Sequence, residues 1–259
     1  MRLTNYSVVL FDAVNLCGFD LTNITDQTFR TVRQFANQRL RIAWEQYPWS
    51  FLTKYAEATV TLDTVTDVKS VTIPTDAGEI VGVFSRNPLA TTQALNVSYA
   101  LVHINNIERI IVNAPVTTVW IEYRTRAPIL SGDAWSATTV YSSGAQCYFD
   151  AGSGNGSLMG EAGKPIKGNF YGASVTLPVG TKPVNDLGGG DSRWSIVNIP
   201  HVFGPYIARG VFADFLRSEQ QYDDAGKADI DAGVILEQEY DKELRQQGQI
   251  RRINFTDSY

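Results

Sequence analysis

The spacing of apolar residues changes twice along the chain and divides it into three zones. In the first zone, apolar residues recur every three or four positions, which is the spacing of one face of a helix. These residues are Phe29, Val32, Ala36, Leu40, Ala43 and Tyr47. Thr25 is a suitable N-cap and Pro48 interrupts the pattern. The first zone therefore predicts a helix over 25–47, with Arg30, Arg33 and Arg41 on a separate solvated or salt-bridged side.

In the second zone, from residue 56 to about 197, the period is two and β-branched residues dominate. Short strand patterns are bounded by Asp, Pro and Gly, and they lie at 60–62, 71–73, 80–83, 97–104, 107–112 and 116–123. Asn105 and Asn106 form a candidate hairpin turn. Many short strands separated by turn residues favour a sandwich or a barrel over alternating strand–helix units.

The third zone, 201–247, returns to helical spacing. Its first helix has a thick apolar face made of Val202, Phe203, Tyr206, Ile207, Val211 and Phe215. After a polar break at 220–224, a second helix is predicted whose inner face carries Ala228, Asp231, Ile235 and Tyr240. Gly248 is in the position of a C-terminal cap. The segment 249–259 then follows as a tail with several apolar residues, which must dock somewhere or lower the solubility of the protein.

These patterns predict an α+β fold in which the first helix packs against the two C-terminal helices. A large antiparallel β insertion, consisting of a sandwich or barrel and a small β module, separates them in sequence. The expected domains are the start of the bundle (1–55), a β domain (56–130), the small β module (131–198), the C-terminal helices (199–247) and a docking tail (248–259). The chain leaves the bundle near Pro48 and returns near Pro200.

The charge balance limits the classes of partner. The 259 residues include 22 Lys and Arg against 27 Asp and Glu, a formal net charge of −5. This balance argues against a protein that wraps nucleic acid, because neutralising phosphates requires a cationic surface. The second C-terminal helix is predicted to have an acidic exposed face made of Asp229, Asp231, Glu237, Glu239, Asp241 and Glu243. We expect no membrane-spanning segment, which would take about 20 apolar residues.

The sequence contains little that predicts catalysis. The glycine-rich stretch 152–164 does not have the spacing of a phosphate-binding loop, and no metalloprotease or hydrolase motif occurs. A dyad of Cys17 or Cys147 with His103 or His201 stays open, because such partners meet only in the fold. We expect no enzymatic activity, no catalytic residues, no metal site and no cofactor.

The segment between Trp135 and Val197 resembles the small chitin-binding modules of chitinases. The similar residues are Trp135, Tyr141, Gly144, the strand at 146–149, the run FYGA at 170–173, and Trp194 to Val197. One interpretation makes Trp135, Tyr141, Tyr171 and Trp194 an aromatic platform for sugar in a glycan-binding or host-adhesion protein of a virion. The alternative makes them the core of the module. Ser174, Val175 and Thr176 stand where sugar-binding members have exposed aromatics, which favours a structural use.

The helical ends of the chain resemble the head-to-tail adaptor proteins of tailed bacteriophages, also called connector or neck proteins. The similar segments are NQRLRIAWE (37–45), YPW (47–49), IPHVF (199–203), ADFLR (213–217), EQEYDKELR (237–245) and QQGQ (246–249). The resemblance implies a structural virion protein, assembled in the host cytoplasm, that forms a twelvefold ring between the portal protein and a tail or nozzle protein. DNA would pass through the channel of this ring without specific binding.

The resemblance also implies that the C-terminal tail reaches into the portal. Its docking residues would be Ile250, Arg251, Arg252, Ile253, Phe255 and Tyr259. The apolar side chains would be buried against portal subunits, and the two arginines would pair with acidic portal groups.

Overall fold

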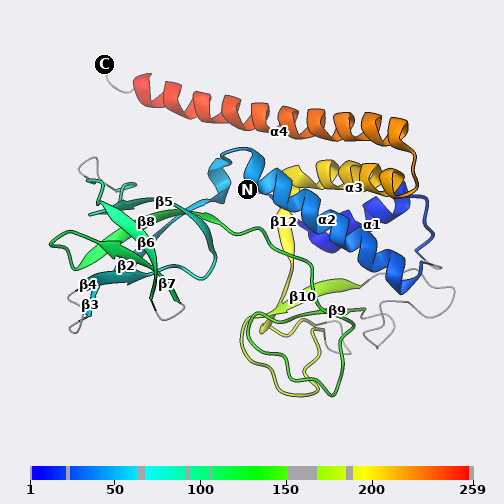
Figure 1. Cartoon of the computed structure of the whole chain (residues 1–259), viewed down its shortest axis with the longest axis horizontal. Coiled ribbons are helices and arrows are strands. Elements are labelled where there is room, and N and C mark those ends of the chain that lie inside the picture. Colours follow the sequence, from blue (N-terminus) through cyan, green and yellow to red (C-terminus); the bar gives the residue numbers. More distant parts are fainter. Residues whose placement is uncertain are drawn as a thin grey trace. The chain divides into compact units, whose positions relative to one another are not determined.

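The chain forms two units, and the second is inserted into the first. Unit 1 contains Met1–Tyr47 and Pro128–Tyr259, whereas unit 2 contains Pro48–Ala127. The computed structural model (Figure 1) describes residues 2–21, 24–63, 68–90, 94–104, 107–150, 168–184 and 189–256. The predicted α+β fold is confirmed: helices come from both ends of the chain, and the sheets between them are antiparallel.

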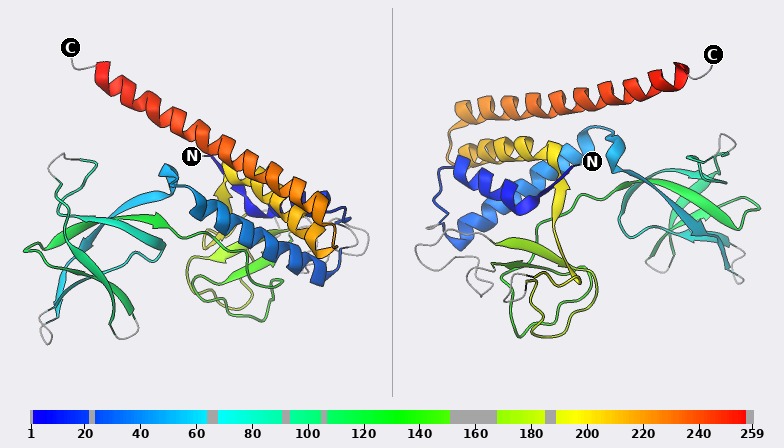
Figure 2. Two further views of the ribbon diagram at one scale, coloured as in Figure 1. Left: turned by 45° about the horizontal axis from the view of Figure 1, so that its top comes forward. Right: turned by 180° about the vertical axis from the view of Figure 1, so that it is seen from behind.

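The helices of unit 1 form the predicted bundle. Helix α2 (Asp26–Gln46) and helix α4 (Tyr222–Thr256) both lie against α3 (Gly204–Ser218), as Figures 1 and 2 show. The side chain of Thr25 accepts a hydrogen bond from the backbone N–H of Thr28 and caps α2, and the helix ends just before Pro48, as predicted. The short 3₁₀-helix η2 (His201–Phe203) leads into α3.

A further helix, α1 (Tyr6–Leu16), was not predicted from the sequence. The side chain of Asn5 accepts a hydrogen bond from the backbone N–H of Ser7 and caps it. Its buried face includes Tyr6, Val9, Leu10, Ala13 and Val14, so the helical spacing was present in the sequence. Before α1, strand β1 (Leu3–Asn5) pairs antiparallel with β12 (Asn198–Pro200), which joins the two chain segments of the unit.

Helix α4 differs from its prediction in length and in part of its buried face. It begins at Tyr222, inside the expected polar break, and continues through Gly248 to Thr256, so Gly248 does not end it. The residues buried along α4 are Ala225, Ala228, Ala232 and Leu236. Of the predicted inner residues, Ala228 is buried, and Ile235 and Tyr240 are half-buried. Asp231 is exposed, which fits its assignment to the acidic face and corrects its assignment to the inner face.

The small β module belongs to the same unit as the helices. Its sheet contains β9 (Gln146–Phe149), β10 (Asn169–Ala173) and β11 (Trp194–Ile196) in the order β11-β10-β9, all antiparallel. The glycine-rich stretch 152–164 lies outside the described residues.

One face of α2 holds the module. The Phe29 ring stacks on Phe170 at a centroid distance of 6.5 Å and meets the edge of Tyr148 at 6.0 Å. The side chain of Asn37 forms two hydrogen bonds with the backbone of Leu130, donating to its carbonyl and accepting from its N–H, both at 2.9 Å. Helix α2 is therefore the common partner of the module and of α3.

The arginines of α2 only partly match the predicted salt-bridged side. Arg30 pairs with Asp26 and Asp133, and Arg41 pairs with Glu45, as expected. Arg33 instead donates to the carbonyl of Gly132 at 2.8 Å, and its guanidinium lies 5.6 Å from the centroid of the Phe170 ring.

Unit 2 is a sandwich of two antiparallel sheets. The first has the order β2-β8-β5, with β2 at Thr53–Thr59, β5 at Ala77–Phe84 and β8 at Thr118–Thr125. The second has the order β3-β4-β7-β6, with β3 at Thr61–Asp63, β4 at Val68–Thr72, β6 at Tyr99–Ile104 and β7 at Ile107–Val112. The short 3₁₀-helix η1 (Ser50–Leu52) precedes β2.

The core of the sandwich takes residues from both sheets. It includes Val71, Ile110 and Val112 from the second sheet and Val83, Val119 and Ile121 from the first. Of the two predicted alternatives, the sandwich is therefore formed, and no barrel closes. Strands β6 and β7 pair with Ile104 opposite Ile107, while the predicted turn residues Asn105 and Asn106 lie outside the described residues.

The contact between α2 and the module generates a first prediction. Phe29→Ala removes a ring that is only 1% exposed, and we expect a loss of about 3–5 kcal/mol in the free energy of unfolding. Tyr222→Ala, at an aromatic residue that is 68% exposed, is the matched control and should change it by less than about 0.5 kcal/mol. Urea unfolding followed by far-ultraviolet circular dichroism measures both. Equal effects would contradict the proposed role of Phe29.

Candidate functional site

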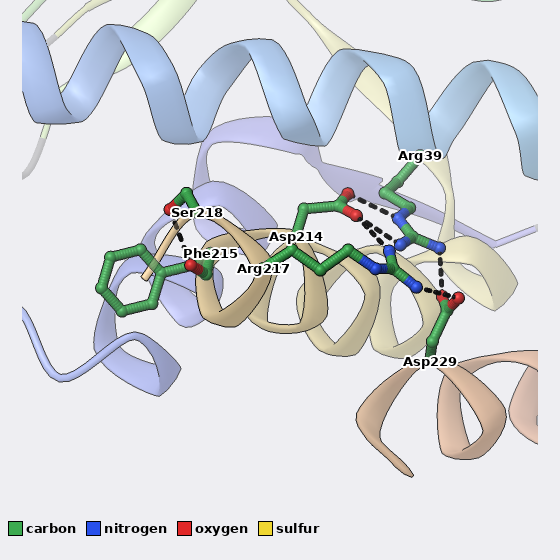
Figure 3. Close-up of polar contacts among 6 residues, drawn as sticks. All are labelled: Arg39, Asp214, Phe215, Arg217, Ser218 and Asp229. Carbon is green, nitrogen blue, oxygen red and sulfur yellow. Dashed lines mark hydrogen bonds and ion pairs between the residues drawn. The ribbon is translucent and has the colours of Figure 1, made fainter. Parts of the chain in front are cut away.

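A buried arginine joins three helices of the bundle (Figure 3). Arg39 of α2 donates from Nε and Nη2 to the two carboxylate oxygens of Asp214 on α3, at 2.7 and 2.5 Å. Its Nη1 donates to Asp229 on α4 at 2.6 Å. Arg217 of α3 donates to the same two carboxylates, at 2.9 and 2.6 Å. We call these four residues the Arg39 clamp.

The backbone of α3 leaves room for this arginine at Gly210. A Cβ atom at this position would lie 2.7 Å from Cδ and 2.9 Å from Nε of Arg39. Because the guanidinium is held on two sides by carboxylates, the side chain has little freedom to move away. Glycine is therefore the residue that allows the Arg39 stem to cross α3.

The clamp is electrically matched, with two guanidinium groups facing two carboxylates. Burial alone would lower the pKa of Arg39, but the hydrogen bonds and charge of Asp214 raise it above its usual range. Partial burial opposes ionisation of Asp229, yet hydrogen bonds from Arg217 and Arg39 lower its pKa below the ordinary value. The hydrogen bond to Asp229 likewise raises the pKa of Arg217. All these shifts favour the charged forms.

The clamp corrects the prediction for Asp229, and the clamp itself was not predicted from the sequence. Asp229 was assigned to the exposed acidic face of α4, whereas it points into the bundle. Arg39 was not recognised as a site residue, although it lies on the apolar stripe of α2, three residues after Ala36 and four before Ala43. A charge in such a stripe is the signal that could have identified it, because a buried charge needs a partner.

The clamp holds only the first part of α4. The last described ring contact of this helix is made by Tyr240, which stacks on Tyr47 with a centroid distance of 4.3 Å and an interplanar angle of 10°. Helix α3 has 15 residues and α4 has 35, so α4 runs well beyond the end of α3, as Figure 2 shows. Helix α4 is thus held near its start by the charged pairs of Asp229, and its later turns extend beyond α3.

The predicted docking residues lie at this far end. Residues 250–255 belong to the last turns of α4, so the segment is helical and continuous with the bundle. Tyr259 lies outside the described residues. Their role in docking stays a prediction.

The four aromatic residues of the proposed sugar platform are core residues. Trp135, Tyr141, Tyr171 and Trp194 are between 6 and 9% exposed and pack together with Phe149 and Leu177. The Trp135 ring meets the edge of Phe149 at 5.5 Å, and Tyr141 meets Trp194 at 5.2 Å. They therefore fill the module and do not form an exposed platform, which corrects that assignment.

Both candidate thiols are buried. Burial raises the pKa of Cys17 and of Cys147 to about 12, which keeps each thiol protonated at neutral pH. A protonated thiol is a poor nucleophile. Within the described ranges, no three His, Cys, Asp or Glu side chains gather as a metal site would require. No described helix is long and apolar enough to cross a membrane.

The sequence matches no protein-family model, and no curated protein is significantly similar to it.

The clamp generates a second prediction. Arg39→Ala leaves two partly buried carboxylates with one guanidinium, and we expect it to cost about 2–3 kcal/mol of the free energy of unfolding. Arg41→Ala on the same helix removes an exposed pair with Glu45 and should cost about 0.5 kcal/mol or less. Urea unfolding of both variants tests this. A similar, small cost for both would show that the clamp does not hold the bundle.

The lowered pKa of Asp229 generates a third prediction, on the pH dependence of stability. The pKa of Asp229 in the folded state lies below the unfolded value of about 3.9. Asp229 therefore contributes fully to the free energy of unfolding above about pH 3.9, and this contribution is lost as the pH falls through the folded pKa. We expect wild type to lose stability below about pH 4 and Asp229→Asn to lose less over the same interval. Urea unfolding between pH 7 and pH 3 measures the two slopes. Identical slopes would exclude Asp229 as a source of the acid sensitivity.

Proposed function

We propose that this chain is a head-to-tail adaptor of a tailed bacteriophage virion. Copies of the chain form a ring, of twelve subunits by the resemblance, between the portal protein and a tail or nozzle protein. The ring works by geometry and buried surface and carries out no catalysis. The proposal rests on the sequence resemblance, and the shape of unit 1 supports it.

The supporting observation is the extension of α4 beyond α3. A helix of 35 residues is about 52 Å long, while α3 supports only its first part. The far end carries Ile250, Ile253 and Phe255 together with Arg251 and Arg252. A long helix that extends beyond its own bundle and has apolar and cationic residues in its last turns suits docking on another protein.

The Arg39 clamp fixes the start of this helix. A docking helix holds its own bundle in a defined position on the partner only if its other end is fixed to that bundle. The clamp does this, because it joins α4 to both α2 and α3. In the adaptor, α4 would enter the portal while the bundle stays in the ring.

The exposed acids of α4 suit a channel for DNA. Asp231, Glu237 and Asp241 are exposed on the helix, and Asp229 no longer counts among them. Where such a surface faces DNA, like charge repels the phosphates and prevents binding during passage. These acidic residues are why the proposal includes a channel for DNA.

Co-purification with the cognate portal protein tests the adaptor function. Ile253→Asp places a charge at the end of α4, and we expect it to weaken binding to the portal about tenfold or more. Ile230→Asp is the matched control, because it lies on α4 near the clamp and is 69% exposed. It should bind as wild type does.

Removal of residues 250–259 provides a second variant. We expect the shortened chain to keep its helical circular dichroism and to lose the portal. If wild type does not bind the portal, the proposed function fails. If the shortened chain and Ile253→Asp bind as wild type does, α4 is not the docking element.

A further inference from the structure

Two glycines weaken the part of α4 that packs on α3. Gly226 and Gly233 lie between Ala225 and Leu236, which are buried. In the described part of the chain, a Cβ atom added at either glycine would meet no heavy atom within 4 Å beyond the nearby backbone of the helix. Packing therefore does not require glycine at either position. Each glycine still makes the helix less stable than alanine would, because glycine loses more conformational freedom on folding.

The apolar contact between α3 and α4 is small. The cluster of buried residues that joins the two helices consists of Ala213, Leu216, Ala225 and Ala228, with Phe212 packed against it. Further along α4, Ala232 and Leu236 are also buried. An alanine buries a single methyl group, so it stabilises a contact less than a larger aliphatic residue does. Separation of α4 from α3 therefore exposes little apolar surface.

The Arg39 clamp is divided unevenly among the three helices (Figure 3). Arg39 and Asp214 join α2 to α3 by two hydrogen bonds, and their side chains are 9% and 18% exposed. Asp229 joins α4 to this pair by one hydrogen bond from Arg39 and one from Arg217, and its side chain is 34% exposed. If α4 separates from α3, Asp229 returns to water while Arg39 keeps the carboxylate of Asp214. The separation thus leaves the buried arginine paired.

The other helices of unit 1 are held more firmly. Helix α2 keeps its pair with Asp214 and its contacts with the β module through Phe29 and Asn37. Helix α3 keeps Ile207 and Val211, which are fully buried and do not belong to the cluster that joins it to α4. Opening of α4 therefore requires less free energy than unfolding of the whole unit, which is the condition for a local transition.

We propose that α4 is an arm that opens from the bundle, with Asp229 as its latch. In the closed state, Arg39 and Arg217 hold Asp229, and the arm packs on α3. In the open state, α4 has left α3, its helix is unfolded around Gly226 and Gly233, and α1, α2 and α3 stay folded. Detachment and unfolding occur together, because a helix without tertiary contacts is only marginally stable in water and internal glycines lower its stability further.

Opening is a property of the chain alone, but its use rests on the proposed function. An arm that opens can change its direction while its far end meets the portal, and closing of the latch then fixes the bundle relative to the portal. A portal that binds the closed arm better shifts the population toward it. Because opening is measured without the portal, failure of this inference and failure of portal binding are distinguishable.

Hydrogen exchange of the full chain, followed by mass spectrometry, tests the proposal. We expect the protection of the backbone amides at 225–236 to be at least about tenfold lower than that of the α3 amides. Gly233→Ala should raise the protection of this segment about fivefold, the factor that corresponds to the low helix propensity of glycine. Asp229→Asn should lower it about fivefold or more, because the latch loses its charge-assisted hydrogen bonds.

Ile207→Val is the matched control. It removes one methyl group from a fully buried residue of α3 that lies outside the cluster facing α4. We expect it to lower the protection of the α3 amides about fivefold and to leave that of residues 225–236 unchanged, because the arm opens before the bundle unfolds. Circular dichroism melting verifies that the variants are folded.

Three results would overturn the proposal. The first is equal protection of α3 and of residues 225–236 in the wild-type chain. The second is a loss of protection in both segments in Ile207→Val, since α4 would then open only when the whole unit unfolds. The third is unchanged exchange of residues 225–236 in Gly233→Ala.

Discussion

The pairing of Arg39 with Asp214 and Asp229 is the constraint on which the helical bundle depends. A guanidinium that leaves water must be matched by charge and hydrogen bonds, and carboxylates from two other helices supply both. This requirement limits how α2, α3 and α4 can be arranged. It matters most for α4, whose buried face is made largely of alanine and so contributes little apolar area. Small residues let α4 approach closely, and the charges then determine where it lies.

Helix α2 carries two of the contacts that build unit 1. One side holds Arg39, and another carries Phe29, Arg33 and Asn37, which fix the β module. The module has a core of aromatic rings, as a small sheet needs when it has little aliphatic volume. Its aromatic residues are used for folding, and its attachment to α2 makes it part of the bundle's own unit. This arrangement favours a structural role for the module over the binding of sugar.

The proposed function uses unit 1. This unit has a helix, α4, that is clamped near its start and extends beyond α3. A long helix with apolar residues at its end suits docking on another protein, which is why the proposal assigns docking to α4.

The sequence by itself determined the elements whose signals are local. Thr25, the stripe from Phe29 to Tyr47 and Pro48 predicted α2, because capping and helical periodicity involve neighbours within a few residues. The period of two in the middle of the chain predicted antiparallel strands in a sandwich or a barrel for the same reason, and the structure decided for the sandwich. Helix α1 was predictable in principle, since its buried residues have helical spacing, but its short apolar run was not recognised as a helix.

Only the tertiary structure decided which residues meet. Arg39 and Asp214 are 175 positions apart, and no local pattern shows that they share a buried pair. The inner face of α4 was misjudged because its alanines give a weak apolar signal, so Asp229 and Asp231 could be distinguished only by the partners present in the fold. Gly248 was taken as a helix end because glycine often has that role, but the helix continues through it. The burial of Trp135 and Trp194 was likewise settled by packing, because an aromatic residue in a sequence suits a core and a binding surface equally well.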